Sequence, residues 1–210
     1  SFLFQERYLR ILFIVSVILM AVNLYAIFFI APMVPEQHWA QKIFYVHVPI
    51  AWSSFLSFFI VMVSGILFFI KKDSYWDRVG LAAAEIGTLF VALVLITGPI
   101  WATPIWGKPW IWEPRLTTTL ILFLIYIGYF MLRKFVGHPE RVARYAAVLG
   151  ILAFLDVPLI FYSVKFWAPQ YQLHPQVEMN QQPDEILLPF FFSMFTFTIL
   201  YILMLRFRVK

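Results

Sequence analysis

Residues 9–30 read LRILFIVSVILMAVNLYAIFFI, and Arg10 is the only charged residue among them. A helix needs about 20 consecutive apolar residues to cross the roughly 30 Å hydrocarbon core of a bilayer. The run is too long for the apolar part of a secretory signal peptide, and it has no small-residue cleavage site. It therefore predicts a membrane-spanning helix.

Five more apolar runs follow, so the sequence predicts an all-α, polytopic membrane protein. The chain is 62% hydrophobic and 13% charged, whereas roughly a quarter of the residues of a soluble domain are charged. Pro49 predicts that the second regular helix begins close to His47. We expect one six-helix domain over residues 1–210, with spans near 9–30, 43–70, 79–100, 116–132, 145–167 and 186–207.

The basic residues divide unequally between the two sides of this topology. Of 16 Lys and Arg, 12 fall on the side of the two termini and four on the other. Because cytoplasmic loops carry an excess of Lys and Arg, both termini are predicted to be cytoplasmic. Three outer loops, near residues 31–42, 101–115 and 167–185, would then face the extracytoplasmic side.

Tryptophan is concentrated on that outer side. Of eight Trp residues, Trp76 alone is predicted to be cytoplasmic, although aromatic belts occur at both interfaces. The loop 101–115 reads WATPIWGKPWIWEPR, and its three prolines predict that its Trp residues lie on short kinked pieces. A platform for a flat aromatic ligand explains the asymmetry best; a packed lid over the bundle and simple interface anchoring are the alternatives.

Histidines flank this loop in the topology. His47 opens the second span, with small Ala51 one turn below, and Pro175 holds His174 extended in the last outer loop. Imidazole is a common axial ligand of haem iron, so the two rings are candidates to hold one porphyrin from opposite faces. The alternative is that each is a polar anchor or a helix cap.

Two acidic residues lie within predicted spans. Glu85 and Asp156 could mark a proton or substrate path, but a hydrogen-bonded structural role is the favoured interpretation, with a helix kink at Pro158 near Asp156. The chain has no Cys, no phosphate-binding loop and no Ser-His-Asp or HExxH pattern. We therefore expect no enzyme, and expect another subunit or a gradient to drive any energy-dependent step.

The segment 106–117, WGKPWIWEPRLT, strongly resembles the tryptophan-rich WWD signature of the cytochrome c assembly family of haem-handling membrane proteins. The sequences YVHVP around His47 and LHP around His174 are similar to the histidine segments that flank this signature. Glu113 and Pro114 depart from the pattern, which usually has Asp and a small residue there. The chain length favours the short six-span branch of the family.

The resemblance implies a subunit that binds haem b as a transient cargo at the outer face and delivers it to a CcmE-like haem chaperone for cytochrome c maturation. The implied partners are CcmA-, CcmB- and CcmD-like subunits of an ABC transporter complex. The implied location is the lipid of a bacterial inner membrane, and no nucleic acid is expected as a partner. Arg115 and Lys108 are the candidates for the haem propionates, and Arg115 is favoured for its bidentate fork. The implied axial ligands of the iron are His47 and His174, and the implied platform is Trp106, Gly107, Trp110, Trp112 and Glu113.

Two other functions remain open from the sequence. One is an electron-transfer subunit with a permanently bound haem. Histidine ligands near the middle of the membrane would favour this function, and the sequence has no histidine at such a depth. The other is a gradient-driven transporter that uses Asp156, with the Trp loop as a gate.

Overall fold

The computed structural model describes residues 2–166, 174 and 181–209, and every element in these ranges is helical. A π-helical turn, Ala26–Ile30, ends the first helix, and a 3-10 helix, His38–Ile43, leads into the second. The α-helices are α1 Phe2–Tyr25, α2 Phe44–Lys71, α3 Ser74–Trp106, α4 Pro114–Phe135, α5 Pro139–Ala153, α6 Asp156–Phe166 and α7 Asp184–Val209.

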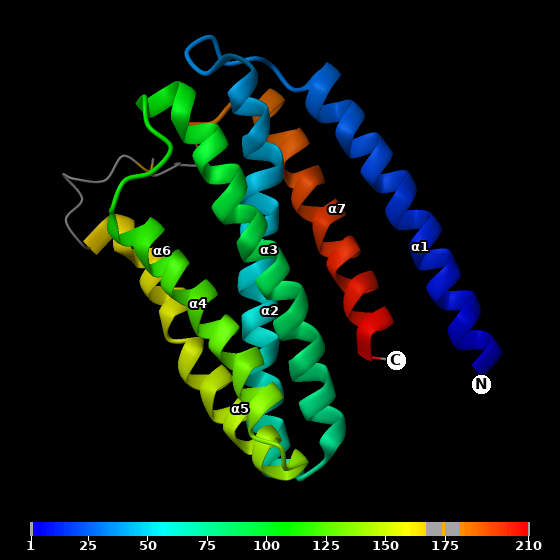
Figure 1. Cartoon of the computed structure of the whole chain (residues 1–210). Coiled ribbons are helices and arrows are strands. Elements are labelled where there is room, and N and C mark those ends of the chain that lie inside the picture. The colour runs from blue at the N-terminus through cyan, green and yellow to red at the C-terminus, as the bar shows by residue number, and fades with distance from the viewer. Residues whose placement is uncertain (1, 167–173, 175–180, 210) are drawn as a thin grey trace.

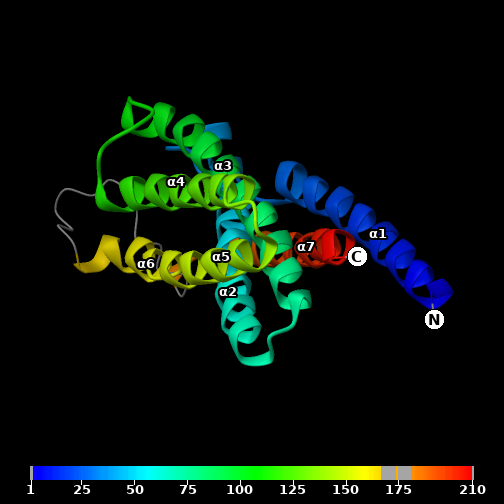
Figure 2. The same cartoon turned by 60° about the horizontal axis from the view of Figure 1, so that its bottom comes forward.

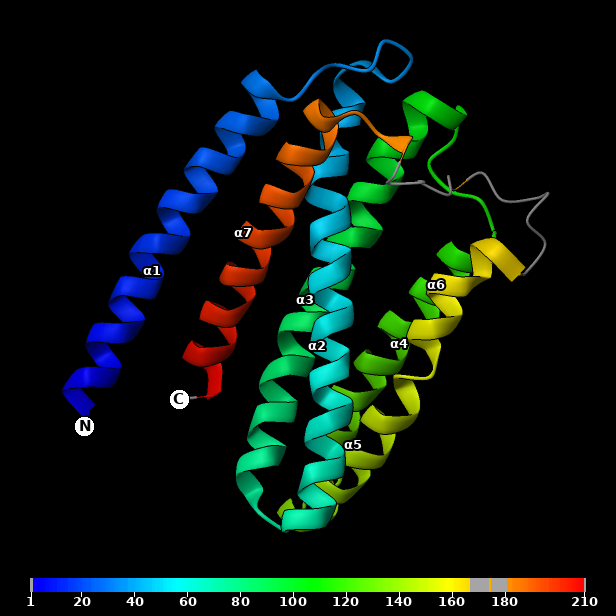
Figure 3. The same ribbon diagram turned by 180° about the vertical axis from the view of Figure 1, so that it is seen from behind.

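Within the described residues, six helical stretches are long and apolar enough to span a membrane, which confirms the predicted all-helical, six-span fold class. The start of α1 and the end of α7 point toward the end of the bundle that carries the α2–α3 and α4–α5 connections (Figures 1 and 3). We call this the terminal end and the opposite one the pocket end. That the terminal end faces the cytoplasm stays a prediction.

Two predicted boundaries at the pocket end were wrong. α2 begins at Phe44 and contains Pro49 inside it, rather than beginning near His47. α3 continues through Pro99 and Pro104 to Trp106, so the predicted loop at 101–115 is non-helical only over residues 107–113. A proline interrupts one backbone hydrogen bond, and membrane helices tolerate this when other groups satisfy the freed atoms.

The fifth span is broken, as expected near Pro158. α5 ends at Ala153 and α6 begins at Asp156, which puts Pro158 in the first turn of α6, where its missing N–H costs nothing. The predicted end of this span at residue 167 lies outside the described residues.

Glu85 is one of the two acidic residues within the predicted spans, and it has a charged partner. Its carboxylate accepts two hydrogen bonds from Arg208, one of them 2.9 Å long, and this ion pair joins α3 to α7.

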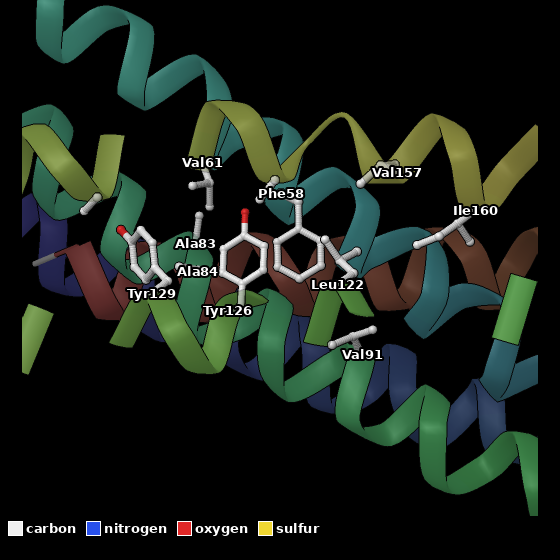
Figure 4. Packing of buried hydrophobic residues seen from close by; sticks show 12 residues of the cluster. Phe58, Val61, Ala83, Ala84, Val91, Leu122, Tyr126, Tyr129, Val157 and Ile160 are labelled. Carbon is white, nitrogen blue, oxygen red and sulfur yellow. The ribbon is translucent and has the colours of Figure 1, made fainter. Parts of the chain in front are cut away.

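The core forms around α2, which packs against α3, α5 and α7. The rings of Phe58 and Tyr126 stack with centroids 4.1 Å apart (Figure 4). Glycines allow the close approach: a Cβ on Gly87 would lie 2.7 Å from Phe58 Cε1, and one on Gly150 would lie 2.6 Å from Val61 Cγ1. Small residues at helix contacts are the usual way in which membrane helices gain packing contacts.

α1 stands at one edge of the bundle and packs on α7 (Figure 2). A buried hydrogen bond of 2.7 Å, from Ser193 Oγ to Asn23 Oδ1, joins the two helices. α4 and α6 lie side by side on the opposite flank and end lower than α3 at the pocket end (Figures 1 and 3). Residues of α2 and α3 at this end line one cavity together with residues of α4 and α6.

Candidate functional site

A cavity of about 560 Å³ lies at the pocket end. Side chains of α2, α3, α4 and α6 form most of its wall, and residues outside these helices complete it: Gln37, Pro109, Trp110, His174 and the α7 residue Met194. The lining is mainly apolar, as in most sites for cofactor-sized ligands, which occupy roughly 300–1,000 Å³. We call this cavity the pocket.

His47 lines this pocket from α2. Its side chain is 8% exposed, and its Nδ1 lies 2.7 Å from the hydroxyl oxygen of Thr97 on α3. The ring of Trp101 meets that of His47 edge-on, with centroids 5.7 Å apart. Trp101 is held in turn by a hydrogen bond of 3.2 Å from its Nε1 to Gln37 Oε1.

Arg115, in the first turn of α4, also lines the pocket. Its guanidinium donates to the carbonyl oxygens of Ile160 and Phe161 on α6, at 3.3 and 3.1 Å. Its Nη1 lies 3.1 Å from Nδ1 of His174. One side chain thus joins α4, α6 and the segment that carries His174.

Glu113 immediately precedes α4, where Pro114 takes the first helical position. Its side chain is 4% exposed, and its Oε2 accepts a hydrogen bond of 3.3 Å from the backbone N–H of His174. The ring of Trp106 lies edge-on to that of His174, with centroids 6.4 Å apart. Glu113 therefore positions a pocket residue without lining the pocket itself.

The tryptophans of the WWD-like segment divide between the pocket and the surface. Trp106 and Trp110 line the pocket, whereas Trp112 is 75% exposed and contacts Trp110 edge-on at 5.6 Å. Gly107 and Lys108 are exposed and do not line the pocket. Gly107 ends α3 with a φ of +73°, a conformation that glycine adopts without strain.

The pocket thus brings together five of the nine predicted site residues: His47, Trp106, Trp110, Arg115 and His174. Sequence reasoning placed Trp101 in the predicted platform loop 101–115 but did not name it among the site residues; in the structure it lines the pocket from α3. Sequence reasoning missed Thr97, although a hydroxyl in an apolar run beside Gly98 and Pro99 was a visible signal. Asp156, proposed for a transporter, is not among the pocket-lining residues.

Comparisons with known proteins agree on one family. The family model described as CcmC, Heme exporter protein C, matches residues 1–210. The Heme exporter protein C of Bradyrhizobium diazoefficiens is 35% identical over 89% of this chain and 72% of its own length. The Heme exporter protein C of Paracoccus denitrificans is 32% identical over 87% of this chain and 77% of its own length. A third relative, from Marchantia polymorpha, is named as a ccmC-like mitochondrial protein of cytochrome c biosynthesis. It is 35% identical over 79% of this chain and 70% of its own length.

Proposed function

The chain belongs to the CcmC family of heme exporter proteins, and on that premise we propose that its pocket receives haem and passes it to a haem chaperone. Heme export is the role that the family's name states, and the Marchantia polymorpha relative is named for cytochrome c biosynthesis. In the proposal, haem b is a transient cargo held by His47 and His174 as axial ligands. The chain acts as a carrier and makes or breaks no covalent bond of the porphyrin.

One observation carries this proposal: two imidazoles, an arginine and several tryptophans line the same apolar cavity. Haem is a flat macrocycle with a central iron and two carboxylates. Its iron takes imidazole ligands, its faces stack on indoles, and its carboxylates pair with guanidinium. The pocket holds a side chain suited to each of these three interactions.

Trp110 adds a further sign of fit. Its indole Nε1 is buried and has no hydrogen-bond partner among the described residues. A buried indole N–H usually finds an acceptor, and a haem propionate at this wall would supply one. Arg115 and Trp110 are therefore the proposed propionate partners, whereas Lys108, outside the pocket wall, is less suited to that role.

The proposal also includes partner proteins, which are those that the family resemblance implies. We propose that the pocket end faces the extracytoplasmic side of a bacterial inner membrane, where a CcmE-like chaperone would accept the haem. CcmA-, CcmB- and CcmD-like subunits would complete the complex. Trp112 and Gly107 lie on the exposed surface of the segment 107–113, next to the pocket, so their proposed role is at the rim of the platform.

The experiment is a visible absorption titration of the purified full chain with haem. A bis-imidazole, six-coordinate spectrum is expected, and His47→Ala and His174→Ala should each remove one ligand. His138→Ala is the matched control, because His138 stands at the start of α5, at the terminal end. If both ligand variants kept the spectrum of the unchanged chain, the assignment of the axial ligands would be wrong.

The same titration separates the two rival functions. A resident electron-transfer haem would remain through extensive washing and would not move to an apo-chaperone, whereas a cargo would transfer. A transporter that uses Asp156 would lose function in Asp156→Asn while haem binding stayed intact.

A further inference from the structure

The contact between Arg115 and His174 determines where the imidazole of His174 carries its proton. A guanidinium nitrogen only donates hydrogen bonds, so Nδ1 of His174 must accept the bond of 3.1 Å from Nη1. An imidazolium would place a second donor against Arg115 and is excluded by the same contact. The ring is therefore neutral, with its proton on Nε2.

His47 has the opposite arrangement. The Thr97 hydroxyl has one proton, and it donates this proton to the carbonyl oxygen of Leu93 at 2.8 Å. Thr97 Oγ1 therefore accepts from Nδ1–H of His47 at 2.7 Å. Nε2 of His47 keeps its lone pair, which is the form of imidazole that ligates a metal.

From these opposite tautomers we propose that Arg115 is a latch on His174 that a carboxylate of the ligand opens. The inference rests on the function proposed above, with haem as the ligand. While the latch is closed, the Nδ1 lone pair of His174 is engaged by Arg115, and a proton occupies its Nε2. Neither nitrogen can then bind iron, whereas His47 can.

A carboxylate entering the pocket is a stronger partner for Arg115 than a neutral imidazole, because both groups of the new pair are charged and the pairing can be bidentate. As Nη1 moves to the carboxylate, Nδ1 of His174 is freed. The Nε2 proton moves to Nδ1 through solvent, the Nε2 lone pair binds the iron, and the ring stays neutral. The ring carries one proton before and after the change, so there is no net release or uptake of protons.

Glu113 keeps this change local. Its carboxylate accepts from the backbone N–H of His174, so the chain at residue 174 stays tethered while the ring changes partner. The bonds from Arg115 to Ile160 and Phe161 likewise use Nε and Nη2, and only Nη1 contacts His174. Because Nε2 of His47 already has a free lone pair and Nε2 of His174 does not, His47 would bind the iron first. His174 would bind it after the carboxylate has paired with Arg115.

The test compares two ligands on the purified full chain: haem and its dimethyl ester, in which both carboxylates are blocked. Haem should give a six-coordinate, low-spin spectrum. The ester should bind through His47 alone and give a five-coordinate, high-spin spectrum, the same one that His174→Ala gives with either ligand.

Arg115→Leu removes the latch, so this variant should give the six-coordinate spectrum with the ester as well. Lys165→Leu is the matched control, an exposed cation in the last turn of α6 that does not line the pocket, and it should behave as the unchanged chain with both ligands. The comparison of the two ligands on the unchanged chain needs no variant, so a folding defect in Arg115→Leu would leave the proposal testable.

The outcomes separate this inference from the proposed function. If the unchanged chain gave no bis-imidazole spectrum with haem, the proposed function itself would fail. If it gave that spectrum with haem and equally with the ester, or did not bind the ester at all, the latch would be wrong while haem binding stood.

Discussion

The hydroxyl of Thr97 accepts a hydrogen bond of 2.7 Å from Nδ1 of His47 while donating its own proton to the Leu93 carbonyl oxygen. Two helices, α2 and α3, thus fix the orientation and the tautomer of one pocket imidazole. Outer partners of this kind are known to hold metal-ligating histidines in place.

We predict that Thr97→Val weakens haem binding by about 10- to 100-fold, the usual cost of removing such a partner. Valine keeps the shape of threonine and removes only the acceptor. Thr103→Val is the control, because Thr103 bonds the Pro99 carbonyl on the exposed side of the same helix. Equal affinities for the two variants in a haem titration would contradict the role of Thr97.

Glu113 offers a second prediction, on the segment that carries His174. Glu113→Ala removes the acceptor for the His174 N–H, and a buried group left unpaired costs roughly 1–3 kcal/mol. We expect the six-coordinate spectrum with haem to shift toward five-coordinate, with ligation by His47 retained. Glu36→Ala, at an exposed position before the 3-10 helix, should leave the spectrum unchanged.

The two neighbouring tryptophans should differ in their effect on haem. Trp110 lines the pocket and Trp112 is largely exposed, and a good aromatic stack adds about 0.5–1.5 kcal/mol beyond area burial. Trp110→Ala should therefore raise the dissociation constant for haem several-fold more than Trp112→Ala does. Trp76→Ala, in the first turn of α3 at the terminal end, is the baseline. A larger effect at Trp112 would place the ligand on the surface instead.

The α2–α3 contact allows a test of packing that is independent of haem. A methyl group on Gly87 would lie 2.7 Å from Phe58 Cε1 and 2.9 Å from Ser57 Cβ, whereas one on Gly128 would meet nothing within 4 Å. Gly87→Ala should lower the free energy of unfolding in detergent by about 1–3 kcal/mol, the cost of overpacking. Gly128→Ala should be neutral or slightly stabilising, since alanine favours helix. A denaturant titration of both variants measures the difference.

The six spans could be predicted because each is a long apolar run, and length and hydropathy are properties of single segments. The ends of α3 could not, because proline stops a helix in water but not where other groups satisfy the backbone. The helix passes through Pro99 and Pro104 and runs on to Trp106. Trp101 therefore reaches the pocket wall from a helix rather than from a loop.

The sequence by itself determined the helical membrane fold and the chemistry available at one end of it: two imidazoles, an arginine and a set of indoles. It did so because hydropathy and residue type are written in the chain directly. Only the tertiary structure decided which of these groups share a pocket and which nitrogen of each imidazole is free to bind. Those properties depend on partners such as Thr97 and Arg115, which lie 50 and 59 residues from the histidines they contact. Packing of α2, α3, α4 and α6 brings these pairs together, and no local sequence pattern predicts which residues so far apart in the chain will be in contact.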